Sequence, residues 1–246
     1  MNMNRLLNLL QNNAERGQKV TINAEAGADT THVYLYDAIG GWWGVEAETF
    51  VKELMAIDTA NIMLHINSPG GDVFDGRAIA TAIKQHPANI TAQIDGLCAS
   101  AATYVSAACN SVTMADGGFY MIHEGWTLAI GNKRDMDKTR ALLAKVDDAI
   151  LNDYQKKTGL ERDQLNIWME EETWFSASEA KNHGFIDSIL DDEKTDSTNN
   201  RTRWNLSAYA NTPAALAASN EPEPEIEESE HRARLKRQVE ALALAI

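Results

Sequence analysis

The sequence predicts an α/β fold in which helices pack on a largely parallel sheet. Between about residues 30 and 190, apolar runs of strand length alternate with segments of helical periodicity, and the pattern recurs about every 25 to 30 residues. Hydrophobic residues make up 44% of the 246-residue chain, which is ample for a packed core. The alternation stops after about residue 190. We therefore expect one α/β domain over 30–190, preceded by an N-terminal segment, 1–29.

Each expected element has a local reason. Apolar or alternating runs predict strands at 32–39, 61–67, 89–95, 111–115 and 119–123. Helical periodicity predicts helices at 47–57, at the segment before Pro87, and at about 100–109. A long polar helix is expected over roughly 133–157, projecting beyond the compact part. Shorter helices follow, one of them opened by the capping box of Ser176 and Glu179 and closed by Gly184.

The C-terminal region has a different composition. Residues 191–230 include the stretches "DDEKTDSTNNRTRW" and "EPEPEIEESE", which predict a mostly disordered acidic linker. Residues 231–246 place Leu235, Val239, Leu242 and Ile246 on one face of a helix. Because so short a helix is marginal alone, its apolar face needs a partner. The simpler interpretation is a frayed tail without function.

Charge excludes several classes of partner. The net charge is −14, and basic residues nowhere cluster with aromatic ones, so nucleic acids and anionic membranes are poor candidates. The apolar patch "LLNLL" is too short for a signal segment or a membrane span, and we expect a cytoplasmic protein. Cys98 and Cys109 match no metal-binding or disulfide spacing and are expected in the core. We expect no metal and no cofactor.

A pair of glycines stands between a predicted strand and a predicted helix, in "INSPGGDVFDGRAIATAI". Gly70 and Gly71 cost backbone entropy, which suggests that bare backbone must closely approach something. A turn, a phosphate or a reacting oxygen would each explain them. The loop lacks the Lys-Ser/Thr of a phosphate-binding P-loop, which argues against a phosphate.

Two side chains are candidates for nucleophilic catalysis. Ser100 follows a predicted strand and begins a helix of small residues, where its hydroxyl would be exposed and helix N–H groups would face negative charge. The ordinary role of such a serine is an N-cap. His123 ends the strand "FYMIH" and could reach a neighbouring site, whereas His65, in the middle of a strand, is expected to be packed.

Four strings together resemble one family. The segments "INSPGGDV", "GLCASAA", "YMIHEG" and "ETWFSASEAKNHGFID" have the order and context of the Clp protease proteolytic subunits, and are most similar to their phage head maturation branch. The resemblance covers about residues 30–190, and Ser100 follows Gly71 by the 29 positions typical of that family. It implies the spiral of β-β-α units that this family shares with crotonases.

The resemblance also implies roles for individual residues. Ser100 would be the nucleophile and His123 the general base, with the N–H groups of Gly71 and Ala101 forming an oxyanion hole. The family often places an aspartate four residues before the serine of "FSASEA"; this chain has Glu172 there, with Glu171 as its rival. The simpler interpretation is that both glutamates form a solvated helix end.

Partners follow from the same resemblance. We expect protein substrates, capsid or scaffold proteins in the phage branch, and a homo-oligomer like the family's heptameric rings. The segment Ile130–Asp135 would offer an edge on which extended peptide pairs. Residues 1–30 and the acidic tail do not resemble the ATP-dependent enzyme, which places dependence on an ATPase in doubt. The alternatives are an inactive scaffold with this fold and, less favoured, a crotonase-like acyl-CoA enzyme.

Overall fold

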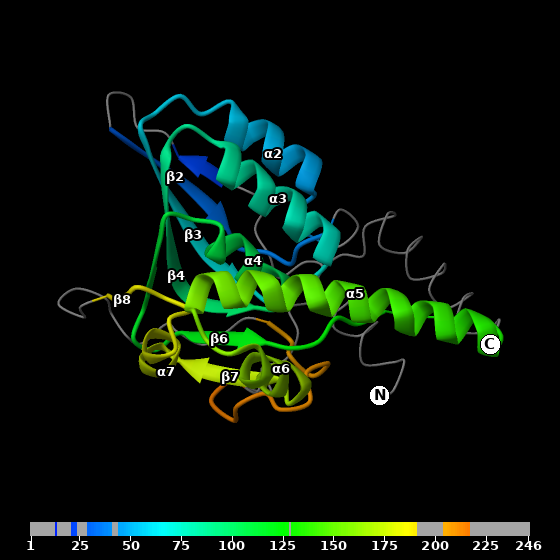
Figure 1. Cartoon of the computed structure of the whole chain (residues 1–246). Helices are drawn as coiled ribbons and strands as arrows, with labels where there is room; N and C mark the ends of the chain where they lie inside the picture. The colour runs from blue at the N-terminus through cyan, green and yellow to red at the C-terminus, as the bar shows by residue number, and fades with distance from the viewer. Residues whose placement is uncertain are drawn as a thin grey trace, which may run out of the picture.

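The structure, a computed structural model, describes residues 13, 21–23, 29–40, 44–127, 129–190 and 204–216 (Figure 1). The strands are β1 (Thr21–Asn23), β2 (Thr30–Leu35), β3 (Asn61–Ser68), β4 (Asn89–Ala99), β5 (Ser111–Met114), β6 (Phe119–Ile122), β7 (Thr173–Ser176) and β8 (Ser188–Ile189). The helices are α2 (Ala47–Met55), α3 (Val73–Gln85), α4 (Ala101–Ala107), α5 (Lys133–Thr158), α6 (Arg162–Glu170) and α7 (Ala177–Asn182).

The sheet is mostly parallel and it forks. Strands follow the order β1-β2-β3-β4-β5-β8, with parallel pairing from β2 through β8 and an antiparallel β1 at the edge. The long strand β4 pairs with β5 over Thr91–Ile94 and then with β6 over Leu97–Ala99. Strand β7 lies antiparallel to β6 and completes this second arm. The predicted α/β architecture is therefore confirmed.

Alternation of burial explains how the layers form. Successive residues of β2, β3 and β4 are alternately buried and half-buried, so one face of the sheet enters the core. Helices α2, α3 and α4 lie against this face, as Figure 1 shows. The other face carries polar groups: His65 shares a hydrogen bond with His32 at 2.9 Å and donates to the Asp95 carboxylate at 2.8 Å. His65 is thus packed within a polar network.

Helix α5 projects from the body of the molecule, as predicted (Figure 1). A capping box of Asn132 and Asp135 opens it, and Gly159 ends it in the left-handed region at φ 71°. Its buried residues, Ile150, Leu151 and Tyr154, all lie in its C-terminal half. The predicted peptide-pairing edge at 130–135 is wrong for Lys133–Asp135, because these residues form the first turn of this helix and turn their hydrogen-bonding groups along its axis.

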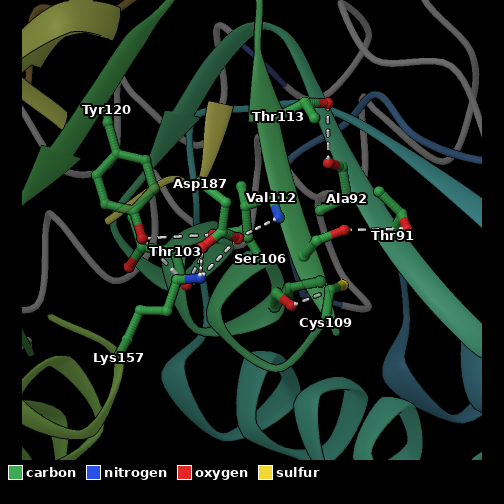
Figure 2. Close-up of polar contacts among 12 residues, drawn as sticks. Thr91, Ala92, Thr103, Ser106, Cys109, Val112, Thr113, Tyr120, Lys157 and Asp187 are labelled. Carbon is green, nitrogen blue, oxygen red and sulfur yellow. Dashed lines mark hydrogen bonds and ion pairs between the residues drawn. The ribbon is translucent and has the colours of Figure 1, made fainter. Parts of the chain in front are cut away.

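Hydrogen bonds hold α4 against the neighbouring elements, as Figure 2 shows. The Ser106 hydroxyl lies 3.3 Å from the Tyr120 hydroxyl, which also donates to the Thr103 carbonyl. Nearby, Asp187 accepts from the Val112 N–H at 2.7 Å and pairs with Lys157 at 3.0 Å. These bonds tie α4 to β6 and the end of α5 to β5, so the helix that follows Ser100 is held on several sides.

The two cysteines are core residues, as predicted. Cys98 and Cys109 are free and buried, and burial raises the pKa of the Cys98 thiol to about 12. Within the described part of the chain, no group of histidine, cysteine and carboxylate side chains is arranged to hold a metal ion. None of the described helices is long and apolar enough to cross a membrane.

The prediction of a disordered linker is wrong for residues 204–216, which we call the covering segment. Trp204 is fully buried, and with Leu206, Tyr209 and Leu216 it packs against the second arm of the sheet. The segment is drawn in orange in Figure 1, beside β7. A few large apolar side chains suffice to bury a segment whose average composition is polar. The other residues of 191–230, and the predicted helix 231–246, lie outside the described residues.

The N-terminal segment 1–29 is described only at Asn13, at β1 and at Asp29. Asn13 pairs with Asn205 of the covering segment: its Nδ2 donates to the Asn205 carbonyl at 2.8 Å, and its Oδ1 accepts from the Asn205 N–H at 2.7 Å. Residues from both ends of the chain therefore meet beside the second arm.

Candidate active site

Ser100 lies at the sharp bend between β4 and α4. Its φ of 53° and ψ of −124° are unusual for a residue other than glycine, and this strained strand-to-helix bend is typical of hydrolase nucleophiles. The Ser100 N–H donates to the Met121 carbonyl at 2.9 Å, which ties the bend to β6. Its side chain makes no N-cap hydrogen bond. The simpler N-cap role is therefore not the one that the structure gives this serine.

His123 follows β6 and meets Ser100. The distance between His123 Nε2 and Ser100 Oγ is 2.7 Å, a hydrogen bond in which the hydroxyl donates when the ring proton is on Nδ1. Burial lowers the pKa of His123 to about 4, so the ring is neutral near pH 7 and can accept the serine proton. The structure thus brings together the two side chains that the sequence singled out.

The paired glycines form the wall beside this dyad. Gly70 and Gly71 have φ values of 86° and 150°, which side-chain-bearing residues rarely adopt. A Cβ on Gly70 would lie 2.6 Å from the Ser100 Cβ, and one on Gly71 would collide with the Ile39 carbonyl. Glycine is required at Gly70 because its backbone packs against Ser100, and at Gly71 because its backbone packs against that of Ile39.

Two N–H groups are available to a substrate oxygen. Ala101 is the first residue of α4, a position whose N–H has no acceptor within the helix, and the helix dipole favours negative charge there. The Gly71 N–H forms none of the backbone hydrogen bonds that the described loop residues make. Gly70 brings the loop against Ala101, because a Cβ on Gly70 would lie 2.9 Å from the Ala101 nitrogen. This arrangement suits an oxyanion hole.

Glu172 comes directly before β7 and does not bond to His123. The β6–β7 ladder ends with the pair Ile122 and Thr173, so His123 and Glu172 each lie one residue beyond its last pair. Its carboxylate instead accepts from the N–H groups of Ala210 at 2.9 Å and Asn211 at 2.7 Å. The Nδ1 atom of His123 is buried with no hydrogen-bond partner among the described residues. Ser100 and His123 form a hydrogen-bonded dyad here, and the Glu172 carboxylate is bonded elsewhere.

The structure distinguishes Glu172 from its rival. Glu172 is buried, with a positive φ of 51°, whereas Glu171 is exposed and offers its backbone carbonyl to the Asn211 side chain at 2.5 Å. A positive φ outside glycine indicates a backbone held in place by its surroundings. A solvated helix end describes Glu171 and does not describe Glu172.

Sequence reasoning missed two aromatic residues at the site. The ring centres of Trp126 and Tyr209 lie 4.6 Å and 5.6 Å from that of His123. The Tyr209 hydroxyl donates to the Pro69 carbonyl at 2.6 Å, directly before the glycine pair. Burial raises the pKa of this phenol, and the nearby Ser100 hydroxyl partly opposes the rise. The sequence signal was present, as Trp204, Leu206 and Tyr209 interrupt an otherwise polar stretch.

The chain after His123 is held by acidic side chains. Asp147 on α5 accepts from the Gly125 N–H at 2.7 Å. Burial, together with the negative charges of Asp147 and Glu170, raises the pKa of Glu124. A hollow between α5 and α6 lies beside these residues and is also lined by Arg140. This region positions His123 from its C-terminal side.

Comparison with known proteins agrees with this geometry. The sequence model of the family described as Clp protease matches residues 31–193. The chain belongs to the Clp protease family. The match includes the glycine pair, Ser100, His123 and Glu172, and ends before the covering segment.

Individual relatives give the same result. The ATP-dependent Clp protease proteolytic subunit of Deinococcus radiodurans is 29% identical over 151 residues, covering 59% of this chain and 74% of the relative. Subunit 1 of the corresponding protease of Chlamydia abortus is 31% identical over 149 residues, covering 57% and 77%. These bacterial relatives are Clp protease subunits by name and do not bear on the phage branch.

A solved structure supports the fold. A mutant of ClpP1 from Listeria monocytogenes matches with a TM-score of 0.59 and 23% sequence identity, covering 66% of this chain and 92% of that one. The chain therefore has the ClpP-like spiral that the sequence resemblance implied. It also has residues beyond the segment that the family model matches, among them the covering segment.

Proposed function

We propose that this Clp protease family member is a serine endopeptidase in which Ser100 is the nucleophile and His123 the general base. The observation that carries the proposal is the 2.7 Å hydrogen bond between Ser100 Oγ and His123 Nε2, at a strained bend beside bare glycine backbone. A nucleophile within hydrogen-bond reach of a neutral imidazole is the basic requirement for acyl transfer to serine.

The reaction would follow from these positions. His123 Nε2 takes the hydroxyl proton as Ser100 Oγ attacks the peptide carbonyl carbon, and the carbonyl oxygen becomes an oxyanion. The N–H groups of Gly71 and Ala101 then donate to this oxyanion, a contribution of about 2.7 to 4 kcal/mol per donor in other hydrolases. The imidazolium returns its proton to the leaving amine, and water releases the acyl group by the same steps in reverse.

The third member of the proposed mechanism is Glu172. A carboxylate that accepts from His123 Nδ1–H would fix the tautomer needed for catalysis and stabilise the imidazolium. Its place directly before β7, as His123 directly follows the paired strand β6, supports this role, although in the structure its oxygens accept from Ala210 and Asn211. Glu172 must therefore turn toward His123 to take it up.

Labelling with a fluorophosphonate probe tests the nucleophile. We expect the probe to modify Ser100, to be lost in Ser100→Ala and to be weakened by a factor of about 10³ or more in His123→Ala. Ser178, an exposed serine, offers a matched control because Ser178→Ala removes a hydroxyl far from the dyad in the chain. Equal labelling of wild type and His123→Ala would contradict His123 as the base.

We further propose that the enzyme belongs to the phage head maturation branch and cleaves capsid or scaffold proteins. The resemblance of "ETWFSASEAKNHGFID" to that branch and the acidic composition after residue 216 support this role. A homo-oligomer that works without an ATPase of its own fits the same proposal. Cleavage of a scaffold protein by the purified chain without ATP would support it, and a strict need for an unfoldase would contradict it.

A catalytically inactive scaffold is the second candidate. One observation favours it: His123 Nδ1 has no partner, while Glu172 is engaged by backbone N–H groups. Such a protein would keep the fold without turnover. Fluorophosphonate labelling separates the two, because an inactive scaffold would show no modification of Ser100 in wild type or in any variant that opens the site.

A further inference from the structure

The covering segment is attached to the arm of the sheet that carries His123. Apolar residues of β4, β6 and β7 form one side of the contact, and apolar residues of the segment form the other. The contact consists of Leu97, Ala99, Phe119, Met121, Trp126 and Trp174 on the arm, with Trp204, Leu206, Ala208, Tyr209 and Leu216 on the segment. Since Trp204 is fully buried, this is packing of the kind found in protein cores.

Tyr209 is the residue through which the covering segment contacts His123. Its ring lies between Trp126, at 5.1 Å, and Trp174, at 5.7 Å, with its edge toward His123. Its hydroxyl donates to the Pro69 carbonyl, directly before the Gly70 backbone that packs against Ser100. A peptide whose carbonyl carbon is attacked by Ser100 must occupy this same space, so Tyr209 and a substrate exclude each other.

Glu172 holds the segment in a second way. The N–H groups of Ala210 and Asn211 both point at its carboxylate, which gives two charge-assisted hydrogen bonds at 2.9 and 2.7 Å. The Asn211 side chain adds a bond to the Glu171 carbonyl. The carboxylate best placed to serve His123 is thus used to bind the segment.

The same two contacts leave the histidine incomplete. A neutral imidazole that accepts at Nε2 must carry its proton on Nδ1, and here that N–H is buried with no acceptor in good hydrogen-bonding geometry, the Glu124 backbone giving only a weaker interaction. A buried donor without a well-placed acceptor is unfavourable, and the Glu172 carboxylate would satisfy it after turning toward His123. The covered site therefore lacks both an open substrate path and its proposed acid.

We propose that the surface formed by β6, β7 and the Pro69–Gly71 loop is a peptide-binding site, and that its resident ligand is the chain's own covering segment, acting as an inhibitor. The inference rests on the proposed function, which it deepens. Departure of the segment opens the dyad to substrate and frees Glu172 to accept from His123 Nδ1–H. One movement thereby provides access and completes the triad.

Two substitutions loosen the segment without touching Ser100, His123 or Glu172. Tyr209→Ala removes the ring that blocks the dyad, and Ala210→Pro removes one N–H that Glu172 accepts. The control for the second is Ala214→Pro, since exposed Ala214 occupies the second position of the turn closed by the Leu216 N–H to Pro213 carbonyl bond, where proline is tolerated. Tyr209→Phe keeps the ring and loses only the hydroxyl.

The rate of fluorophosphonate labelling of Ser100 in the full chain is the main measurement. We expect Tyr209→Ala and Ala210→Pro to raise it about tenfold or more over wild type, Tyr209→Phe to raise it less, and Ala214→Pro to leave it unchanged. Equal rates in wild type, Tyr209→Ala and Ala210→Pro would overturn the inhibitory segment while leaving the serine nucleophile established. Absence of labelling in every variant would instead overturn the proposed function.

Two further readouts separate this inference from simple loss of structure. Hydrogen exchange at the Ala210 and Asn211 amides should be slow in wild type and fast in Tyr209→Ala, while β4 amides stay protected in both. A labelling rate that falls as protein concentration rises would show that the segment acts on a neighbouring copy, which contradicts inhibition within one chain. A labelling rate independent of concentration supports the proposal.

Discussion

Ser100 and Glu172 belong to regions that are built in different ways. Ser100, which is hydrogen-bonded to His123 Nε2, is fixed by a strand, a bend and a helix that are continuous in the chain, with backbone bonds to β6. Glu172 is held by a segment that begins 32 residues later in the chain. Ser100 is hydrogen-bonded to His123, whereas Glu172 is hydrogen-bonded to the covering segment. Backbone hydrogen bonds hold the region around Ser100, whereas the packing of the covering segment determines the contacts of Glu172.

This difference teaches where control can act. Moving Ser100 would break backbone ladders and expose the core around α4, which costs much of the stability of a small domain. Moving the covering segment breaks one apolar contact and a few hydrogen bonds, a change within the range of local opening. The two regions should therefore respond very differently to substitution.

The largest effect on activity is expected from a substitution in the region around Ser100. Gly71→Ala forces a Cβ onto the Ile39 carbonyl and shifts an oxyanion donor, so activity should fall about 10² to 10³-fold, even in the Tyr209→Ala background. Peptide hydrolysis in that background measures this. The matched control is Gly159→Ala, where φ is also positive at 71° but no atom lies within 4 Å of the added Cβ. It should cost about 1 kcal/mol of stability and leave turnover intact.

The next effect concerns the pH dependence of folding. Burial lowers the pKa of His123 from 6.5 to about 4, so below pH 6.5 the unfolded chain binds a proton that the folded ring refuses. Stability should therefore fall as pH falls from 6.5 to 4, by about 3 kcal/mol for this group. Urea unfolding at a series of pH values measures the loss.

The control for this pH effect removes the titrating ring. His123→Asn should reduce the loss between pH 6.5 and 4, because the buried ring then no longer contributes to it. Tyr209→Ala should also reduce it, since uncovering His123 gives water to the ring and moves its pKa back toward 6.5. An unchanged pH dependence in both variants would show that His123 is not buried in solution as it is in the structure.

The smallest of the three effects changes sign between backgrounds. Glu172→Gln keeps one acceptor oxygen and replaces the other with a donor, so it should weaken the covering segment and raise Ser100 labelling about threefold to tenfold in wild type. In the Tyr209→Ala background the same change should lower peptide hydrolysis, because the acid is missing. A decrease in both backgrounds would contradict the role of Glu172 in holding the segment.

Much of the region around Ser100 could be predicted from the sequence, because the residue patterns that indicate it are local in the chain. The glycine pair follows a strand and precedes a helix, and the small residues around Ser100 allow α4 to pack closely, as Ala101 and Ala102 are fully buried. His123 ends an apolar strand run. Such features depend on near neighbours in the chain, and their spacing carried the family resemblance.

The second region could not be predicted because its contacts are distant in sequence. Strand β7 was missed: four residues between two helices show no period of their own, and pairing with β6 alone makes them a strand. The covering segment was assigned to a linker on its average composition. Its burial depends instead on a few apolar side chains, namely Trp204, Leu206, Tyr209 and Leu216. The error at 130–135 was avoidable, since Asn132 and Asp135 have the spacing of a capping box.

The fork in the sheet has a consequence for timing. Because β4 belongs to two ladders at once, over Thr91–Ile94 and Leu97–Ala99, the bend at its end is anchored before any ligand arrives. In the covered state, the strand, bend and helix around Ser100 are therefore already in place. Activation would then need no refolding, only the lifting of a loop, which proteins complete in microseconds to milliseconds.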